Sequence, residues 1–244
     1  MEKLKKSLAL AAALIFVFCL ALPSFADELA VKNGALYRID AAGKEKPIIT
    51  NPVRINSFDT IKGIGYAVGI DIEEEGSEGL DEGVYFFDKS GKFIKFFEDE
   101  ESYKNEVFFS PDGKYVVLSR GTYVDRFDRI FRFDTGELVD EFLSQGIRWL
   151  DSKRLAFAYI DESKGDRAED SQITGWLSIV VYDVKKNKLE TVMEATATED
   201  YHLDDVDFKS GELIVWKYSV KKQSEWANDG AAIEKIRVPI PAAR

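Results

Sequence analysis

The chain has 244 residues, a formal net charge of −11 at pH 7, one histidine and one cysteine. The excess of acidic residues excludes the basic surface that a nucleic-acid-binding protein needs, so we expect no nucleic-acid partner. A single cysteine excludes a disulfide framework within the chain, and a single histidine excludes a metal site built on several imidazoles.

The first 26 residues have the pattern of a secretory signal peptide. Three lysines precede an apolar run over residues 8–20, and the sequence Pro-Ser-Phe-Ala ends at Ala26 with the small residues that a signal peptidase reads. We expect cleavage after Ala26 and a secreted or periplasmic protein whose residues 27–244 form one domain. Retention of the leader as a membrane anchor is the alternative. No later apolar run approaches the roughly 18 residues of a spanning helix.

Two kinds of tight β-hairpin alternate along the rest of the chain. In the first kind a strand ends in Asp and the chain turns through Gly or Asn, which tolerate the backbone conformations of tight turns. The four copies of this hairpin cover residues 36–44, 84–92, 130–137 and 179–188. Their aspartates are roughly 48 residues apart, and a repeat of this length indicates an array or a propeller.

The second kind of hairpin lies between these copies and is clearest over residues 107–121, where Ser-Pro-Asp-Gly joins two strand-like runs. Proline presets the first turn position, and glycine supplies the conformation that a side chain would forbid. Further copies cover residues 53–70, 147–160 and 206–219. Two hairpins make four strands, and a four-stranded unit of about 40 to 50 residues is typical of a propeller blade.

The segment from Phe109 to Val116, Phe-Ser-Pro-Asp-Gly-Lys-Tyr-Val, resembles the PD40 (WD40-like, TolB-type) β-propeller repeat. The turn Asp134-Thr135-Gly136 is similar to the end of the third strand of that repeat. The turns at residues 151–153 and 209–211 depart from it, since they lack the proline. The resemblance implies the propeller fold and leaves the function open, because propellers carry many unrelated activities.

We therefore predict an all-β protein, a β-propeller of about five four-stranded blades, with four blades as the alternative. Counting strands gives roughly four and a half blades. Closure of the ring removes exposed sheet edges. For this reason we expect the N- and C-terminal strands to share a closing blade.

The longer connections are expected on the face opposite the short turns. They cover residues 71–82, 99–104, 121–128, 161–175, 194–205 and 220–232. Loops on a rigid scaffold are where binding is usually found, although tolerated insertions would look the same. Trp226 lies in the last of these loops, where Lys221 and Lys222 add local positive charge. A loop tryptophan is a typical anchor for a partner, and packing against the rim is the other interpretation.

Two further loop features are candidates for binding. His202 lies in an acidic connection, where a solvated histidine is the alternative to a binding or catalytic one. The loop over residues 71–82 has the acidic spacing of a calcium loop, with a glycine at its sixth position. Its candidate ligands are Asp71, Glu73, Glu75 and Glu82. A solvated acidic loop is the alternative, because strands and not helices flank it. We expect no other cofactor.

These observations favour a monomeric, non-enzymatic binding module that recognises a protein or envelope ligand through its loop face. The serines show no nucleophile-elbow motif, and we assign no catalytic residue. The alternative is a carbohydrate-active hydrolase that uses carboxylates from two blades. The two hypotheses differ in whether such carboxylates face each other across the central channel.

Overall fold

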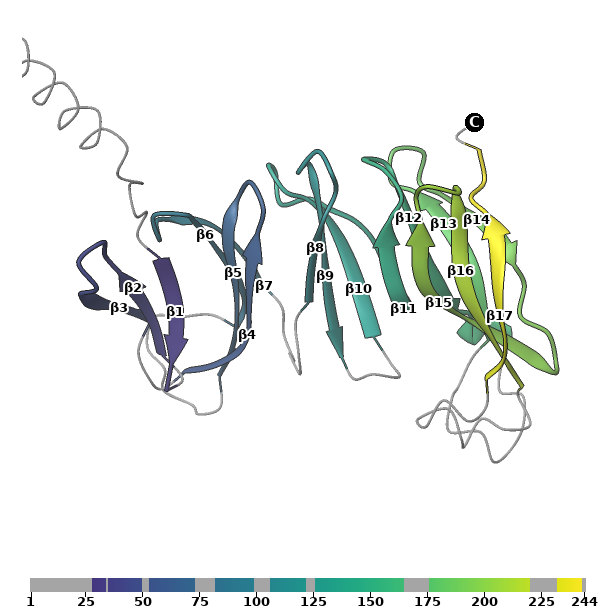
Figure 1. Ribbon diagram of the computed structural model, residues 1–244, viewed down its shortest axis with the longest axis horizontal. Helices are drawn as coiled ribbons and strands as arrows, with labels where there is room; N and C mark the ends of the chain where they lie inside the picture. Colours follow the sequence, from purple (N-terminus) through teal and green to yellow (C-terminus); the bar gives the residue numbers. More distant parts are fainter. Residues whose placement is uncertain are drawn as a thin grey trace, which may run out of the picture.

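The computed structural model describes residues 28–33, 35–49, 53–72, 82–98, 106–121, 126–164, 176–219 and 232–242. Within these ranges the chain forms antiparallel strands and one short 3-10 helix, η1 (Glu162–Lys164), and no α-helix (Figure 1). The predicted all-β class is confirmed. No helix in the described part of the chain is long and apolar enough to cross a membrane.

The strands form four sheets in which each strand pairs with the next one along the chain. The first sheet contains β1 (Glu28–Lys32), β2 (Ala35–Ile39) and β3 (Glu45–Ile49). The second contains β4 (Val53–Ile61), β5 (Gly65–Ile72), β6 (Gly83–Asp88) and β7 (Phe93–Glu98). The third contains β8 (Glu106–Phe109), β9 (Tyr115–Gly121), β10 (Arg126–Arg132), β11 (Leu138–Trp149), β12 (Arg154–Ile160), β13 (Leu177–Asp183) and β14 (Lys188–Met193). The fourth contains β15 (Glu199–Asp207), β16 (Glu212–Ser219) and β17 (Ala232–Pro239). All eight predicted hairpins are present.

The seven-stranded sheet is bent within β11. This strand pairs with β10 up to Ser144 and with β12 from Ser144 onward, and its register to β12 shifts between Gln145 and Arg148. Gly146 lies in this irregular stretch with a φ of +67°, a conformation that favours glycine. We therefore describe five units: unit 1 (β1–β3), unit 2 (β4–β7), unit 3 (β8–β11), unit 4 (β11–β14) and unit 5 (β15–β17).

Four hydrophobic clusters hold the units together, one between each pair of successive units. In β9, Val116 packs toward unit 2 and Val117 toward unit 4. In β12, Phe157 packs toward unit 3 and Ala158 toward unit 5. Because successive side chains of a strand point to opposite faces, the central strands need apolar residues at almost every position. This is why they appear in the sequence as continuous apolar runs.

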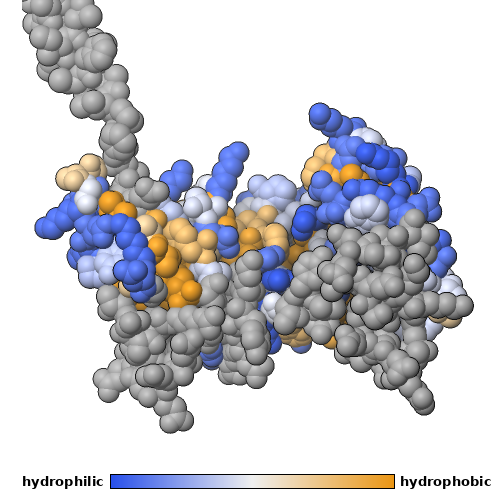
Figure 2. Space-filling view, turned by 60° about the horizontal axis from the view of Figure 1, so that its bottom comes forward, coloured by the Kyte–Doolittle hydropathy of each residue, from blue (hydrophilic) through white to orange (hydrophobic). Residues whose placement is uncertain are grey.

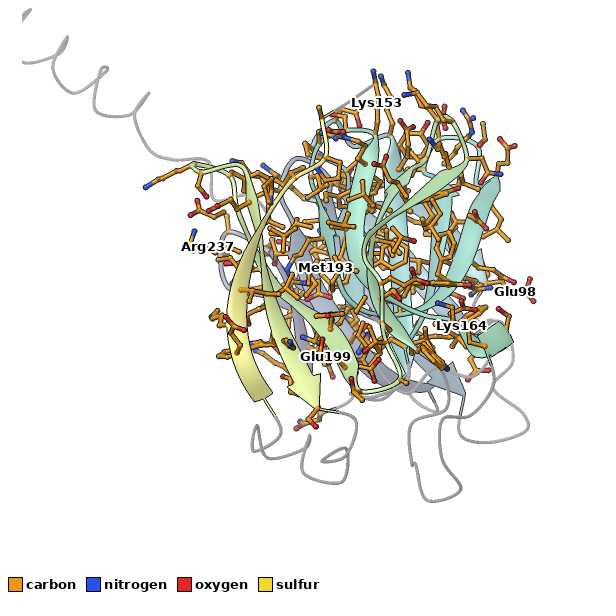
Figure 3. All side chains as sticks on the ribbon, turned by 90° about the vertical axis from the view of Figure 1, so that its right-hand side faces the viewer. Glu98, Lys153, Lys164, Met193, Glu199 and Arg237 are labelled. Atoms are coloured by element: carbon orange, nitrogen blue, oxygen red, sulfur yellow. The ribbon has the colours of Figure 1, made fainter. Side chains whose placement is uncertain are left out.

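The units follow one another from unit 1 at one end of the molecule to units 4 and 5, which lie side by side at the other end (Figures 1 and 3). Among the described strands, none of β1–β3 pairs with any of β15–β17. The prediction of a closing blade that both termini share is therefore wrong for these strands. Among the described strands, β1 and β17 are edge strands that each pair on one side with the neighbouring strand of a local hairpin. Such pairing costs less loop-closure entropy than joining the two ends of the chain.

Candidate functional site

The two ends of the units differ in their connections. At one end, which we call the turn face, short turns close the hairpins, such as those after Asp40, Asp88 and Asp183. At the other end, the loop face, β5, β9, β12 and β16 finish and the connections to the next strands begin (Figure 1). Figure 3 shows Lys153 on the turn face and both Lys164 and Glu199 at the opposite end. The described strand ends from which the longer connections leave therefore lie on one face.

Most of the candidate binding residues lie outside the described residues. These are Trp226, Lys221, Lys222, Glu73 and Glu75. Asp71 belongs to β5, where its backbone pairs with Arg54, and Glu82 immediately precedes β6. Within the described ranges, no group of three or more His, Cys, Asp or Glu side chains is placed to hold a metal ion. The calcium site stays a prediction.

His202 lies in a strand, which corrects its predicted place in a loop. It belongs to β15 and pairs with Trp216 of β16. A Cβ atom built on Gly146 would lie 3.6 Å from the His202 ring, so the ring is at the contact of β15 with β11. The acidic residues around His202 suggested a loop. The buried Tyr201 and Leu203, which flank His202 in the strand, pack against unit 4 and explain why a strand forms here.

A buried polar cluster lies between units 3 and 4, near the loop face. Asp128 of β10 is 1% exposed and accepts a hydrogen bond from the Ser144 hydroxyl. Its strand neighbour Ser119 accepts hydrogen bonds from Arg126, with Nε 2.7 Å from the hydroxyl oxygen and Nη2 2.8 Å from the carbonyl oxygen. Arg126 also lies 3.7 Å from the Glu106 carboxylate. The cluster joins three strands of unit 3 through hydrogen bonds.

The carboxyl group of Asp128 is held in an environment that disfavours its charge. Burial raises its pKa, and this outweighs the hydrogen bonds from Ser119 and Ser144 and the positive charge of Arg126. Its Oδ1 atom has no hydrogen-bond partner among the described residues. A carboxyl group this deeply buried is out of reach of a large substrate, so we interpret the cluster as structural.

This environment predicts a pH-dependent effect of Asp128→Asn. A carboxyl whose pKa is raised on folding contributes stability below its unfolded pKa of about 3.9, and this contribution is lost as the pH rises through the folded pKa. We expect the free energy of unfolding of the wild type to fall relative to that of the Asn variant between pH 4 and neutrality. Urea unfolding of both proteins at a series of pH values measures this difference. A difference that stays constant with pH would contradict the raised pKa.

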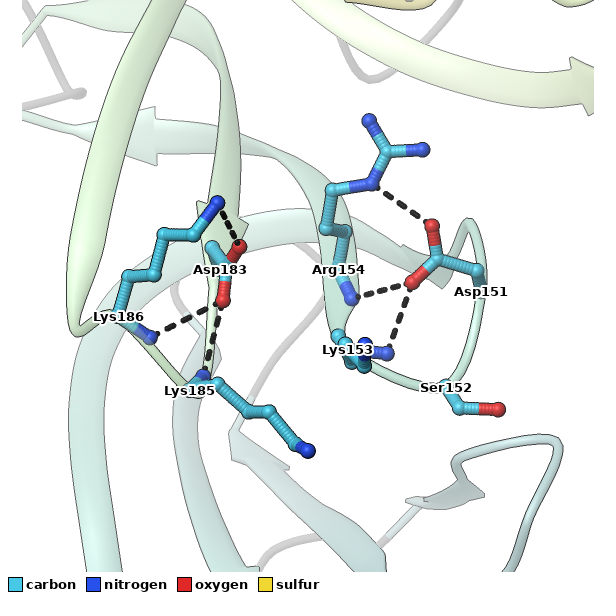
Figure 4. Close-up of a pocket in the computed structure, with 7 residues that line it drawn as sticks. All are labelled: Asp151, Ser152, Lys153, Arg154, Asp183, Lys185 and Lys186. Atoms are coloured by element: carbon cyan, nitrogen blue, oxygen red, sulfur yellow. Dashed lines mark hydrogen bonds and ion pairs between the residues drawn. The ribbon is translucent and has the colours of Figure 1, made fainter. Parts of the chain in front are cut away.

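The structure also brings together a group of residues that the sequence did not predict as a site. On the turn face of unit 4, the β11–β12 and β13–β14 turns enclose a pocket of about 400 Å³ (Figure 4). It is lined by Asp151, Ser152, Lys153, Arg154, Asp183, Lys185 and Lys186. In each turn an aspartate is followed within three residues by two cationic residues. This repeated pattern is the sequence feature that could have indicated the site.

No family model matches the sequence, and no curated protein matches it, so the resemblance to the PD40 repeat stays a prediction. Solved structures with a similar arrangement of strands include the hydrazine synthase of Kuenenia stuttgartiensis, with 15% identity, 88% of this chain and 74% of that chain covered, and a TM-score of 0.41. Dihydro-heme d1 dehydrogenase NirN is 8% identical, with 86% of this chain and 43% of that chain covered and a TM-score of 0.45. The C-terminal WD40 domain of Sif2 is 10% identical, with 78% of this chain and 76% of that chain covered and a TM-score of 0.36.

This chain spans less than half of several of the matched chains. The fold of this chain is defined by its own strands. They form antiparallel sheets stacked face to face, with one hydrophobic cluster between each pair of successive units.

Proposed function

We propose that the protein is an exported, non-enzymatic β-propeller that binds a protein or envelope ligand through its loop face. The observation that supports this most is the asymmetry of the two ends. The turn face is made of short, hydrogen-bonded turns, whereas the connections that differ in length from unit to unit leave from the loop face. Variable loops on a rigid scaffold are the usual place for specific binding.

The described part of the loop face supplies a charged surface around units 4 and 5. Lys164 lies 3.0 Å from the Glu194 carboxylate and over the Trp176 ring, with its nitrogen 5.4 Å from the ring centre. In unit 5, Lys217 lies 2.6 Å from the Glu199 carboxylate. The hydrogen bond from Lys217 lowers the pKa of Glu199, so this carboxylate is charged at neutral pH. Polar, charged residues of this kind are typical of the rim of a protein interface.

Apolar residues are also visible between the units when the loop face is turned forward (Figure 2). They gather over the N-terminal half of the row, where units 1 to 3 lie. A surface that combines apolar and charged residues favours a protein partner over a small polar molecule.

The buried carboxyl group between units 3 and 4 does not supply one of the two carboxyl groups that a hydrolase would need. A glycosidase needs two carboxyl groups that flank the bond to be cleaved. Asp128 is 1% exposed and its hydrogen bonds go to serines of unit 3, so a sugar cannot reach it in this arrangement.

The binding proposal is tested by Trp226→Ala. We expect its melting temperature to stay within a few degrees of the wild type and capture of the native partner from envelope extracts to weaken at least tenfold, because truncating an anchor residue costs about 2 kcal/mol or more. Phe208→Ala is the matched control, since Phe208 is an aromatic residue of the turn face that is 66% exposed. Equal loss of capture in both variants, or a large loss of stability in Trp226→Ala, would contradict the proposal.

A further inference from the structure

The pocket on the turn face of unit 4 is formed by two turns whose relative position is fixed by strand pairing. Arg154 of β12 is the register partner of Asp183 of β13, and the backbone N–H of Val184 donates to the Lys153 carbonyl oxygen at 2.8 Å. The two turns therefore lie next to each other although they are about 30 residues apart in the sequence. The walls of the pocket are pre-formed by the backbone.

Both aspartates of the pocket are occupied by the turns that contain them. Asp151 accepts hydrogen bonds from the backbone N–H groups of Lys153 and Arg154, at 2.8 and 3.0 Å, and from the Arg154 guanidinium at 2.7 Å. Asp183 accepts from the backbone N–H groups of Lys185 and Lys186, at 3.0 and 3.1 Å, and lies 3.4 Å from the Lys186 ammonium. Neither carboxylate is left to neutralise the remaining lysines.

The charge of Asp183 is preserved despite its partial burial. Burial raises its pKa, but the hydrogen bonds from Lys186 and Lys185 outweigh this, and the pKa lies below its ordinary value. Asp183 therefore offsets one cation of the pocket, Lys186, at neutral pH.

The remaining cationic groups point to a ligand of negative charge. Lys153 and Lys185 make no ion pair with any residue that the structure describes. Figure 4 shows Lys186 folded back onto Asp183, whereas Lys185 extends away from it. Arg154 uses Nε for Asp151 and Nη1 for the Pro241 carbonyl oxygen, at 2.6 Å, which leaves three of its five N–H donors. With four cations against two carboxylates, the pocket has an excess of two positive charges in an acidic protein.

We propose that this pocket binds a phosphate monoester group. Such a group carries a charge of about −1.5 to −2 at pH 7 and three acceptor oxygens, which suit the excess charge of the pocket and the ammonium groups of Lys153 and Lys185. Arginine and lysine groups form charge-assisted hydrogen bonds with phosphate oxygens. The volume of about 400 Å³ lies within the range of small-molecule pockets, so the phosphate and part of the molecule attached to it can enter.

The proposal concerns the face opposite to the one proposed for partner binding, so the two can fail independently. The test uses the full chain and isothermal titration calorimetry with inorganic phosphate and with phosphoethanolamine. A second arm measures cosedimentation with phosphatidylcholine vesicles that contain phosphatidic acid. The second arm distinguishes a lipid headgroup from a soluble phosphate monoester.

The variant is Lys153→Ala with Lys185→Ala, and the matched control is Lys62→Ala with Lys89→Ala. The control removes the same charge from the corresponding turns of unit 2, where both lysines are exposed. We expect saturable phosphate binding by the wild type, weakened about tenfold or more in the variant and less than twofold in the control, because each lost charge-assisted hydrogen bond accounts for roughly a factor of ten. Thermal melts confirm that the three proteins are folded.

The comparison of phosphate binding by the wild type, the variant and the control supports or overturns the proposed site. Loss of binding in the Lys153 and Lys185 variant alone supports it, and the arm with the tighter binding identifies the source of the phosphate. Equal weakening in the variant and the control would mean that only the total charge matters, which overturns the site. Absence of saturable binding by the wild type in both arms overturns it as well.

Discussion

Phe86→Ala is expected to lower the free energy of unfolding by about 3–5 kcal/mol, the range for removing a buried aromatic side chain. Phe86 is 0% exposed and lies between units 2 and 3. Its ring meets the rings of Phe97, Phe109 and Phe133 edge-on, with centroid distances of 5.7, 5.7 and 5.2 Å. Edge-to-face pairs contribute about 0.5–1.5 kcal/mol beyond the area they bury. The cavity would therefore open in a part of the core that three other aromatic rings share.

Phe93→Ala is the matched control for this variant. Phe93 belongs to the same unit but is 53% exposed, so its truncation should change the free energy of unfolding by no more than about 1 kcal/mol. Urea unfolding followed by circular dichroism measures both. If the two variants were equally destabilised, the packing between units 2 and 3 would not be what stabilises the fold.

Gly146→Ala is expected to destabilise the protein by about 3 kcal/mol or more, through two separate effects. With a φ of +67°, an alanine would adopt a strained backbone conformation that costs about 1 kcal/mol or more. Its Cβ would also lie 2.5 Å from the Leu203 carbonyl oxygen, so the backbone of β11 or β15 must move. Such overpacking typically costs about 1–3 kcal/mol in addition.

Gly113→Ala separates these two effects. Gly113 has a similar φ of +71°, but nothing lies within 4 Å of the position that its Cβ would occupy. We expect this variant to show only the conformational cost, about 1 kcal/mol. Equal destabilisation by the two substitutions would show that the close approach of β15 to β11 contributes nothing.

The hairpins could be predicted from the sequence because their signals are local. In the first hairpin the Asp40 carboxylate accepts hydrogen bonds from the backbone N–H groups of Ala42 and Lys44, at 2.9 and 2.8 Å. Asp88 makes the same pattern with Ser90 and Lys92. All partners lie within four residues, so the composition of the turn was enough to identify it.

The features that could not be predicted depend on contacts between distant segments. A loop was expected around His202, because nothing local indicates that Tyr201 and Leu203 pack against unit 4. The pocket of unit 4 requires the pairing of β12 with β13, whose register places Arg154 opposite Asp183. This register could not be predicted from the two turns alone. Closure of a ring is a property of the whole chain, whereas the pairing of β1 with β2 and of β17 with β16 is local.

The open row of units has a consequence for how the molecule unfolds. Among the described residues, each hydrophobic cluster joins two successive units, as in a repeat protein whose stability is a sum of intrinsic and nearest-neighbour terms. In the described part of the chain, units 2, 3 and 4 each take part in two hydrophobic clusters, and units 1 and 5 in one. Opening an end unit therefore disrupts half as many interfaces as opening a central one. We therefore expect fraying to begin at the two ends of the array and amide exchange to be slowest in the central units.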